Sequence, residues 1–217
     1  CLRDLCYRLK RFHYLYVHYE SEDERGIDVA LLYDSTKVKV LDSRPLRVDL
    51  NEDNTRDILY VKALLHERDT MYAMVCHLPS RLGGGAATEW KRLKAKQVIQ
   101  QQIDSILHQQ PQANIVVMGD MNDEAKNDLS GMSNQMVALE QAGQGTHKYQ
   151  GVWSCLDQYY VSKELKDRVS VQIYSPEWLL EEDNKFLDYQ PKRTFVGFRY
   201  HGGYSDHMPI VLTIYNK

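Results

Sequence analysis

Runs of alternating apolar and polar residues fill the first third of the chain and predict short β-strands. We expect the third run to form a hairpin with the second, and a polar turn to join the fourth run to the fifth. The five runs cover residues 13–19, 27–33, 37–41, 56–65 and 71–76. The acidic run 20–24 is expected to be a solvated loop. A helix is expected at the start, where apolar residues recur at helical spacing: Leu2, Leu5, Cys6 and Leu9.

A longer helical pattern begins after the flexible loop Gly83-Gly84-Gly85. Thr88 is a favourable N-cap residue, and Pro111 ends the pattern. One face of the predicted helix is apolar and contains Ala95, Ile99, Ile103, Ile106 and Leu107. The same segment carries a cationic cluster, which we expect to form a solvated helix face: Lys91, Arg92, Lys94 and Lys96.

Strand patterns return in the second half of the chain. Residues 115–118 are continuously apolar, which predicts a central strand buried on both faces. Residues 156–161 and 210–214 are further strand candidates, and we expect the last of these to have two buried faces. Residues 129–142 permit a helix. Residues 175–200 are predicted to be an irregular surface excursion that packs on its own aromatic side chains.

Composition predicts one soluble globular domain. The chain has 217 residues, of which 43% are hydrophobic and 26% are charged, and no window approaches the roughly 18 apolar residues of a membrane span. A net charge of -3 argues against indiscriminate binding to polyanions, while a local basic groove remains compatible with it. The four cysteines lack the spacing of a zinc site and are predicted to be small buried hydrophobic residues.

Four polar clusters lie at predicted strand ends, where layered α/β folds build their sites. Asp120 and Asp206 offer hard oxygen ligands for Mg²⁺, Mn²⁺ or Ca²⁺. Asn122 offers a neutral amide that can position a water or an oxyanion. Together the clusters indicate metal-assisted hydrolysis of a phosphate ester better than a nucleophilic triad. They are His77, Gly119-Asp120-Met121-Asn122, Asp157 and Ser205-Asp206-His207.

The histidines complete this hypothesis. His207 could act as a general base or as a phosphate-binding cation, with Asp157 fixing its tautomer, and His77 offers a second imidazole. Each cluster also has an ordinary structural interpretation. Gly-Asp-x-Asn is a common turn sequence, His77 could be a satisfied loop residue, and Asp157 could simply terminate a strand. The ordered recurrence of all four clusters favours a shared site.

In these motifs the chain resembles the endonuclease/exonuclease/phosphatase superfamily, which has the deoxyribonuclease I-like fold. The family order is a strand-end His, Gly-Asp-x-Asn, an Asp opening a strand, and a terminal Ser-Asp-His, which matches the four clusters here. The resemblance implies a four-layer α/β sandwich, with two mixed β-sheets face to face and helices outside. It also implies one domain over residues 1–217 and divalent-metal-dependent hydrolysis of phosphoesters, by a nuclease or a phosphatase.

The resemblance also assigns roles to single residues. Asp120 would handle the attacking water, Asn122 would orient it or the phosphate, and Asp206 would bind the metal, with Mg²⁺ expected and Mn²⁺ or Ca²⁺ possible. His207, oriented by Asp157, and His77 would bind the scissile phosphate. The segment from His77 through Ser80 and Arg81 is similar to bacterial members, and we expect three residues to contact substrate: Arg56, Ser80 and Arg81.

One departure from the family pattern concerns the first strands. Family members carry an Asn and then a metal-binding Glu ahead of the helix that opens this chain, and neither is identifiable here. The chain begins with Cys1 rather than Met, so we expect an N-terminally incomplete piece whose missing segment could act in trans. The alternative is a catalytically silent binding or scaffold domain that retains the fold. No signal region is recognisable, and a secreted or cell-envelope location is our expectation.

Overall fold

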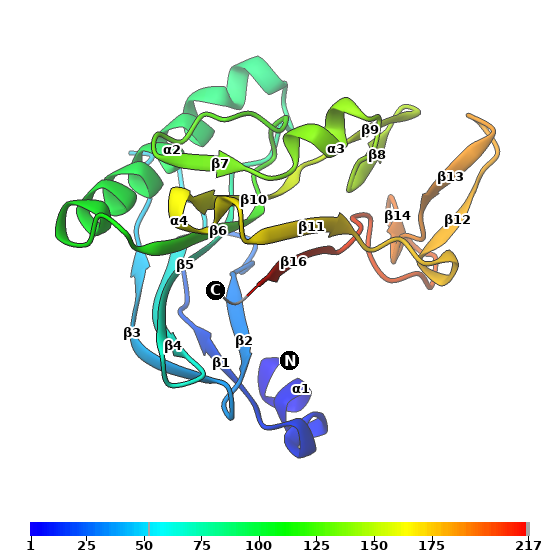
Figure 1. Cartoon of the computed structure of the whole chain (residues 1–217). Coiled ribbons are helices and arrows are strands. Elements are labelled where there is room, and N and C mark those ends of the chain that lie inside the picture. The colour runs from blue at the N-terminus through cyan, green and yellow to red at the C-terminus, as the bar shows by residue number, and fades with distance from the viewer. Residues whose placement is uncertain (52, 216–217) are drawn as a thin grey trace.

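A six-stranded mixed sheet forms the centre of the computed structural model, which describes residues 1–51 and 53–215 (Figure 1). The strand order is β3-β4-β5-β6-β10-β7, in which β5 and β6 are parallel and the other neighbours are antiparallel. The strands span Val38–Leu46 (β3), Ile58–Leu65 (β4), Asp69–His77 (β5), Asn114–Asp120 (β6), Met132–Asn134 (β7) and Asp157–Ser162 (β10). The strands predicted at 56–65, 71–76, 115–118 and 156–161 are therefore confirmed.

Helix α2 (Gly85–Gln109) covers one face of this sheet. Its apolar face packs on every second residue of the central strands, as in the contacts of Ile99 and Ile103 with the core that contains Met74. The helix begins at Gly85, so Thr88 is not its N-cap; instead the Thr88 hydroxyl donates to the Gly84 carbonyl within the first turn. The predicted solvated face is wrong for two of its four cations, since Arg92 and Lys96 are buried.

Two separate strand pairs cover the opposite face of the central sheet and are called here the second layer. They are β1 (Tyr14–His18) with β2 (Ala30–Asp34), and β11 (Val169–Ile173) with β16 (Ile210–Ile214). The first pair packs on β4 and β5, and the second packs on β6 and β10. The mixed α/β architecture that the family resemblance implied is confirmed, with a second β layer built from pairs within the described residues.

Several local predictions require correction. Residues 37–41 belong to β3 and pair with β4 rather than forming a hairpin with β2. β16 is exposed at alternate residues, because no element among the described residues covers its outer face, so the prediction of two buried faces is wrong. The helix predicted at 129–142 shrinks to α3 (Val137–Gln141) behind the short strand β7, since Gly131 takes a left-handed conformation.

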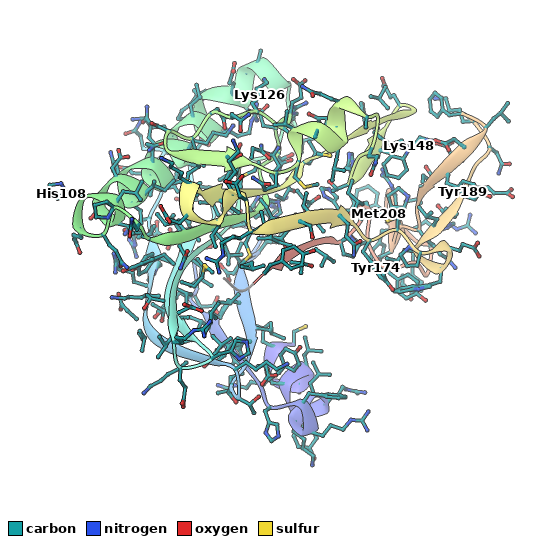
Figure 2. All side chains as sticks on the ribbon, viewed as in Figure 1. His108, Lys126, Lys148, Tyr174, Tyr189 and Met208 are labelled. Atoms are coloured by element: carbon teal, nitrogen blue, oxygen red, sulfur yellow. The ribbon has the colours of Figure 1, made fainter. Side chains whose placement is uncertain are left out.

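The segment 175–200 forms hairpins instead of an irregular excursion. β12 (Leu180–Asp183) pairs with β13 (Asp188–Pro191), and β14 (Phe195–Val196) pairs with β15 (Arg199–Tyr200). Both project from one end of the molecule, where Figure 2 labels Tyr189. Their aromatic side chains are largely exposed, although Phe195 and Tyr200 pack edge to face. The remaining elements are α1 (Leu2–Arg8), η1 (Lys10–Phe12), β8 (His147–Tyr149), β9 (Val152–Ser154), α4 (Lys163–Lys166) and η2 (Glu177–Leu179).

None of the described helices combines the length and the apolar character that crossing a bilayer requires. Of the cysteines, Cys76 and Cys155 are buried as predicted, whereas Cys1 is exposed and Cys6 is partly exposed. Burial raises the pKa of the Cys155 thiol to about 12 and raises that of Cys76 further. These two thiols therefore stay protonated, as expected of small buried hydrophobic residues.

Candidate active site

Three of the predicted catalytic residues form one row across neighbouring strands. His77 at the end of β5 is aligned with Asp120 at the end of β6, and Asp120 is aligned with Asp157 at the start of β10. Side chains alternate between the faces of a strand, so residues two positions away share a face. Val75 and Met118 pack toward the second layer, which places His77 and Asp120 on that same face. The row therefore lies at the open end between the two β layers.

A fourth residue joins the row from the second layer. His207 lies just before β16, and its Nδ1 is 2.6 Å from Oδ2 of Asp157. Burial alone would lower the pKa of His207, but the hydrogen bond to Asp157 and the Asp157 charge outweigh it and raise this pKa. Asp157 thus orients the imidazole and favours its protonated form, with Nε2 left for another partner.

The other two members of the row have strongly shifted pKa values. Burial, together with the nearby charge of Asp157, raises the pKa of Asp120 to about 6. Burial and the charge of Arg56 lower the pKa of His77 to about 4. His77 is therefore neutral near pH 7, and its Nε2 lies 3.5 Å from Oδ2 of Asp120. The site holds a carboxylate able to exchange a proton near neutrality, a neutral imidazole, and a second imidazole whose protonated form is favoured by Asp157.

The turn that follows Asp120 is fixed by its own backbone. Asn122 takes a left-handed conformation, with a φ of 48°, and its amide N–H donates to Asp120 Oδ1 over 2.8 Å. Its side-chain Nδ2 donates to the Leu78 carbonyl over 2.9 Å. At Gly119 a Cβ would lie 1.9 Å from the Cys76 carbonyl oxygen, so only glycine permits this approach of the two strands. The turn therefore holds Asn122 beside Asp120.

A buried ion pair supports the His77 side of the row. Arg56 donates through Nε to the His77 carbonyl over 3.0 Å and through Nη1 to Asp23 over 2.6 Å. Both side chains are almost fully buried. The acidic run 20–24 is thus not entirely the solvated loop that its composition predicts, because Asp23 compensates the Arg56 charge. The sequence alone does not show that Asp23 pairs with Arg56. A buried arginine nevertheless requires a carboxylate or hydrogen-bond acceptors, because an unpaired buried charge is costly.

We expect Asp23→Ala to lower the free energy of unfolding by about 3 kcal/mol, because it leaves the Arg56 guanidinium buried without its carboxylate. Chemical denaturation at pH 7 measures this, with the exposed neighbour Glu24→Ala as the matched control. Arg56 holds the pKa of Asp23 below 3.8 against the opposing effect of burial. The difference between wild type and variant should therefore shrink as the pH falls through that lowered pKa. Equal losses in both variants would contradict the assignment.

The other two expected substrate contacts lie in different settings. Ser80 and Arg56 line a polar pocket of about 220 Å³ beside the His77 end of the row. Arg81 instead donates to the Asn122 carbonyl and to Asp123, each over 3.0 Å. The buried Lys96 also donates to Asp123, over 3.0 Å. Arg81 and Lys96 therefore brace the turn that carries Asn122, and the burial of Lys96 reflects this role.

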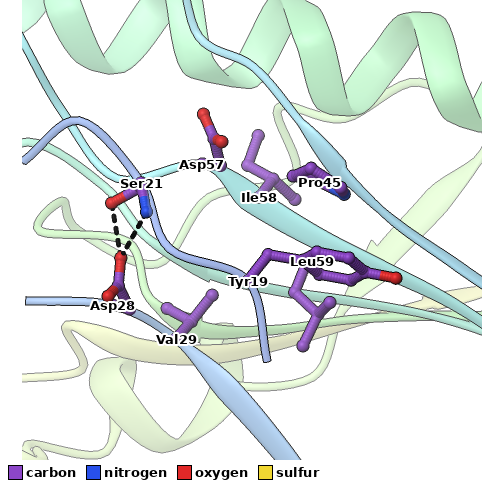
Figure 3. A pocket seen from close by; sticks show the side chains of 8 residues that line it. All are labelled: Tyr19, Ser21, Asp28, Val29, Pro45, Asp57, Ile58 and Leu59. Carbon is purple, nitrogen blue, oxygen red and sulfur yellow. Dashed lines mark hydrogen bonds between the residues drawn. The ribbon is translucent and has the colours of Figure 1, made fainter. Parts of the chain in front are cut away.

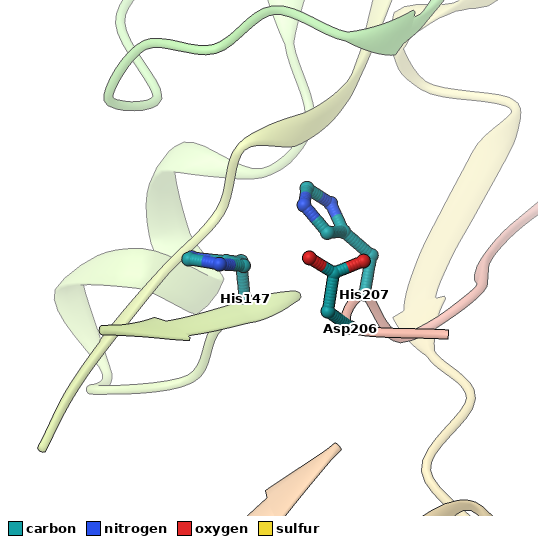
Figure 4. Close-up of side chains that lie close together, drawn as sticks. All are labelled: His147, Asp206 and His207. Carbon is teal, nitrogen blue, oxygen red and sulfur yellow. The ribbon is translucent and has the colours of Figure 1, made fainter. Parts of the chain in front are cut away.

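Asp206 and His147 occupy the other end of the site (Figure 4). His147 opens β8, forms an isolated bridge with His207, and its ring centroid lies 4.8 Å from that of His207. Ligand atoms of Asp206, His147 and His207 all lie within 4.8 Å of one another. Burial and the His207 charge lower the pKa of His147 to about 4. Sequence reasoning missed His147, which has no motif around it and is brought here only by the β8 bridge.

The donor set around Asp206 fits a loosely held hard cation. Mg²⁺ is commonly bound through one or two carboxylates, with waters and substrate phosphates as its other ligands. Asp206 is exposed and can supply such a carboxylate. His147 and His207 add nitrogen atoms that better suit transition metals, and one nitrogen of His207 is already engaged by Asp157. A bound cation would thus be held by Asp206 together with substrate oxygens.

A second, smaller pocket lies away from the row, between β3, β4 and the segment that joins β1 to β2 (Figure 3). Its volume is about 10 Å³, which is close to the smallest space that holds one water molecule. Ser21 donates to Asp28 within it. The 220 Å³ pocket beside His77 is therefore the larger candidate for a substrate group.

Comparisons with known proteins show the family and the fold of the chain. The model of the Endonuclease/Exonuclease/phosphatase family matches residues 2–216. The structure is similar to truncated Caenorhabditis elegans TDP2, with a TM-score of 0.65, 18% identity, and coverage of 99% of this chain and 80% of that chain. It is also similar to the human Nocturnin catalytic domain with bound sulfate anion, with a TM-score of 0.60, 18% identity, and coverage of 96% and 76%.

A third similar structure is D. rerio TDP2 complexed with single strand DNA product. Its TM-score is 0.58, its identity 19%, and the match covers 97% of this chain and 81% of that chain. A search of curated proteins gives no match. At these identities the solved structures establish the shared fold, and the family match spans nearly the whole sequence. The chain belongs to the endonuclease/exonuclease/phosphatase family.

Proposed function

We propose that the protein is a divalent-metal-dependent phosphodiesterase, with Mg²⁺ as its metal and nucleic acid as its substrate class. The observation that carries the proposal is the row His77–Asp120–Asp157 with His207 bonded to Asp157. Family membership supports phosphoester hydrolysis. The similar D. rerio TDP2 structure with single strand DNA product supports the substrate class.

The proposed mechanism assigns one task to each residue. Asp120 accepts the proton of the attacking water, and its raised pKa suits proton transfer near neutrality. Asn122 holds Asp120 in place through its backbone N–H and offers an amide near the reacting atoms. Protonated His207 and neutral His77 donate hydrogen bonds to phosphate oxygens as negative charge develops on them. A cation held by Asp206 would supply further charge neutralisation.

We further propose that oxygen atoms of the substrate phosphate complete the coordination of a metal ion held by Asp206. The support is the composition of the cluster at Asp206, which pairs this one carboxylate with two histidines in the described part of the chain. Hard cations favour oxygen ligands over imidazole nitrogen. Without substrate the protein should therefore bind Mg²⁺ weakly, and a high concentration of the metal should be needed for activity.

We expect hydrolysis of bis(p-nitrophenyl) phosphate to require added Mg²⁺ and to fall to background in excess chelator. The release of nitrophenolate measures both conditions, and re-addition of Mg²⁺ in excess over the chelator is the control for irreversible loss. Full activity in excess chelator would contradict a metal-dependent mechanism. Absence of turnover at every metal concentration, with retained binding of a nucleotide, would instead favour the silent binding domain.

A further inference from the structure

A cationic and aromatic segment stands beside the active site. Residues 190–205 contain three cations and no acidic residue, in a chain whose net charge is -3. The segment includes the hairpin β14–β15 at the right of Figure 1. Its charged and aromatic members are Lys192, Arg193, Phe195, Phe198, Arg199, Tyr200 and Tyr204. The mechanism described above uses none of these residues.

The aromatic rings of this hairpin face solvent. The exposed fractions are 55% for Phe195 and 69% for Tyr200, and Phe198 is fully exposed. Phe195 and Tyr200 pack edge to face with ring centroids 5.5 Å apart, which stiffens the hairpin while leaving ring surface open. Tyr204 continues the series toward the site and packs edge to face on Trp178. A cluster of exposed aromatic rings is typical of a binding surface.

The base of the hairpin is joined directly to the catalytic turn. Gly203 N–H donates to the Arg193 carbonyl over 3.0 Å, and Tyr204 N–H donates to the Lys192 carbonyl over 2.8 Å. A Cβ at Gly203 would lie 2.1 Å from the Lys192 carbonyl oxygen, so this close contact requires glycine. Ser205, Asp206 and His207 follow at once in the chain. The hairpin therefore has a fixed position relative to the site.

Arg193 connects the hairpin to the catalytic cluster. Its Nη2 donates to the Lys148 carbonyl over 3.1 Å, and Lys148 follows His147 directly in the chain. This contact places the guanidinium near the catalytic cluster. Its Nε is buried and has no partner among the described residues. A cation in this position is suited to a phosphate that lies between the site and the hairpin.

We propose that the hairpin of residues 193–201 binds single-stranded nucleic acid. Unpaired bases would stack on Phe198 and on the open surfaces of Phe195 and Tyr200, while Arg193 and Arg199 contact the phosphates. Only unpaired bases offer a free face to such rings, because the bases of a duplex are stacked on one another. The inference rests on the proposed function, which supplies the reason for the nucleic acid to extend from the hairpin toward His207. It identifies single-stranded nucleic acid as the form of the substrate.

Charge and position favour this occupant over a lipid surface. Cations and rings are interspersed along the hairpin, in the order Arg193, Phe195, Phe198, Arg199 and Tyr200, which suits a polymer that carries both phosphates and bases. Glu181 on the neighbouring hairpin is already engaged, because its Oε2 lies 2.6 Å from Nε2 of His201. The hairpin also leads into a phosphoester site rather than away from it.

The test is the affinity for a fluorescein-labelled oligodeoxythymidylate of twelve nucleotides, measured by anisotropy in excess chelator so that no turnover occurs. Stacking of one base contributes about 1–3 kcal/mol, so Phe198→Ala should raise the Kd roughly 5- to 150-fold. The matched control is Leu187→Ala, which removes an apolar side chain that is 92% exposed at the tip of the hairpin β12–β13. Leu187→Ala should bind as wild type does.

Equal affinity of Phe198→Ala and wild type for the oligonucleotide would overturn the inference. Binding to vesicles of phosphatidylserine and phosphatidylcholine that Phe198→Ala abolishes, without oligonucleotide binding, would overturn it in favour of a lipid surface. Because the measurement needs no turnover, it is independent of hydrolysis. Hairpin-dependent binding by a chain that hydrolyses no phosphoester would leave the inference standing and remove only the proposed function.

Discussion

Replacing Asp120 by asparagine should lower kcat for a phosphodiester roughly a thousandfold, within the 10²- to 10⁴-fold range of general acid–base catalysis. The amide cannot accept the proton of the attacking water, whereas the carboxylate, with its pKa raised to about 6, can. In the wild type, activity should be present above this pKa and fall as the pH drops below about 6, because protonation removes the base. A profile of kcat/KM against pH measures this loss of activity at low pH.

The melting temperature of Asp120→Asn distinguishes a loss of catalysis from unfolding. Asp120 is largely buried beside Asp157, and a raised pKa means that folding disfavours its ionised form. The variant should therefore melt at the same temperature as wild type or higher. Asp104→Asn, at an exposed position on α2, is the control and should retain full activity. Retention of wild-type kcat in Asp120→Asn would exclude Asp120 as the base.

Asp157→Ala and His207→Ala should each reduce kcat roughly 10²- to 10⁴-fold, and the double variant should lose little more than the more damaged single variant. The reason is the 2.6 Å contact between Asp157 and His207 Nδ1, through which the carboxylate orients the ring. The two residues therefore act as one unit, and each single substitution disables it. Steady-state kinetics of the three variants measures the coupling.

The control for this cycle is His108→Ala at the exposed end of α2, which should behave as wild type (Figure 2). Multiplicative losses in the double variant would show that Asp157 and His207 act independently, in spite of their contact. Melting temperatures should accompany the kinetics, because Asp157→Ala removes a hydrogen bond that ties the second layer to the central sheet. A cooperative transition in each variant keeps the kinetic comparison valid.

The central sheet could be predicted from the sequence because its strands have strong local patterns. Residues 115–118 are continuously apolar and become β6, and the turn after it carries a recognisable Gly-Asp-x-Asn motif. Because both residues were predicted at strand ends, Asp120 and Asp157 were correctly expected at one edge of the sheet. The pairing of β3 with β4 was not predictable, because the choice between two strand partners depends on contacts outside the hairpin.

Charged residues show where local reasoning fails. Lys96 is predicted to be solvated, yet it is buried, since Asp123 and Asp128 lie about thirty residues later in the chain and accept its hydrogen bonds. Asp23 is likewise paired with a distant Arg56. His147 gains its position only through a bridge to His207. In each case the partner is remote in sequence, so the environment of the charge exists only in the folded protein.

The remoteness of these partners has a consequence for how the protein folds. The residues of the candidate site come from separate strands, and the contact between Asp157 and His207 closes a loop of 50 residues. Closing such long loops lowers chain entropy before the native contacts that stabilise the closed loop have formed. Topologies rich in remote contacts therefore fold slowly. Acquisition of the site should therefore be one of the last events in folding, after α2 has packed on β5 and β6. A refolding chain would regain helical content well before it regained the geometry around Asp157.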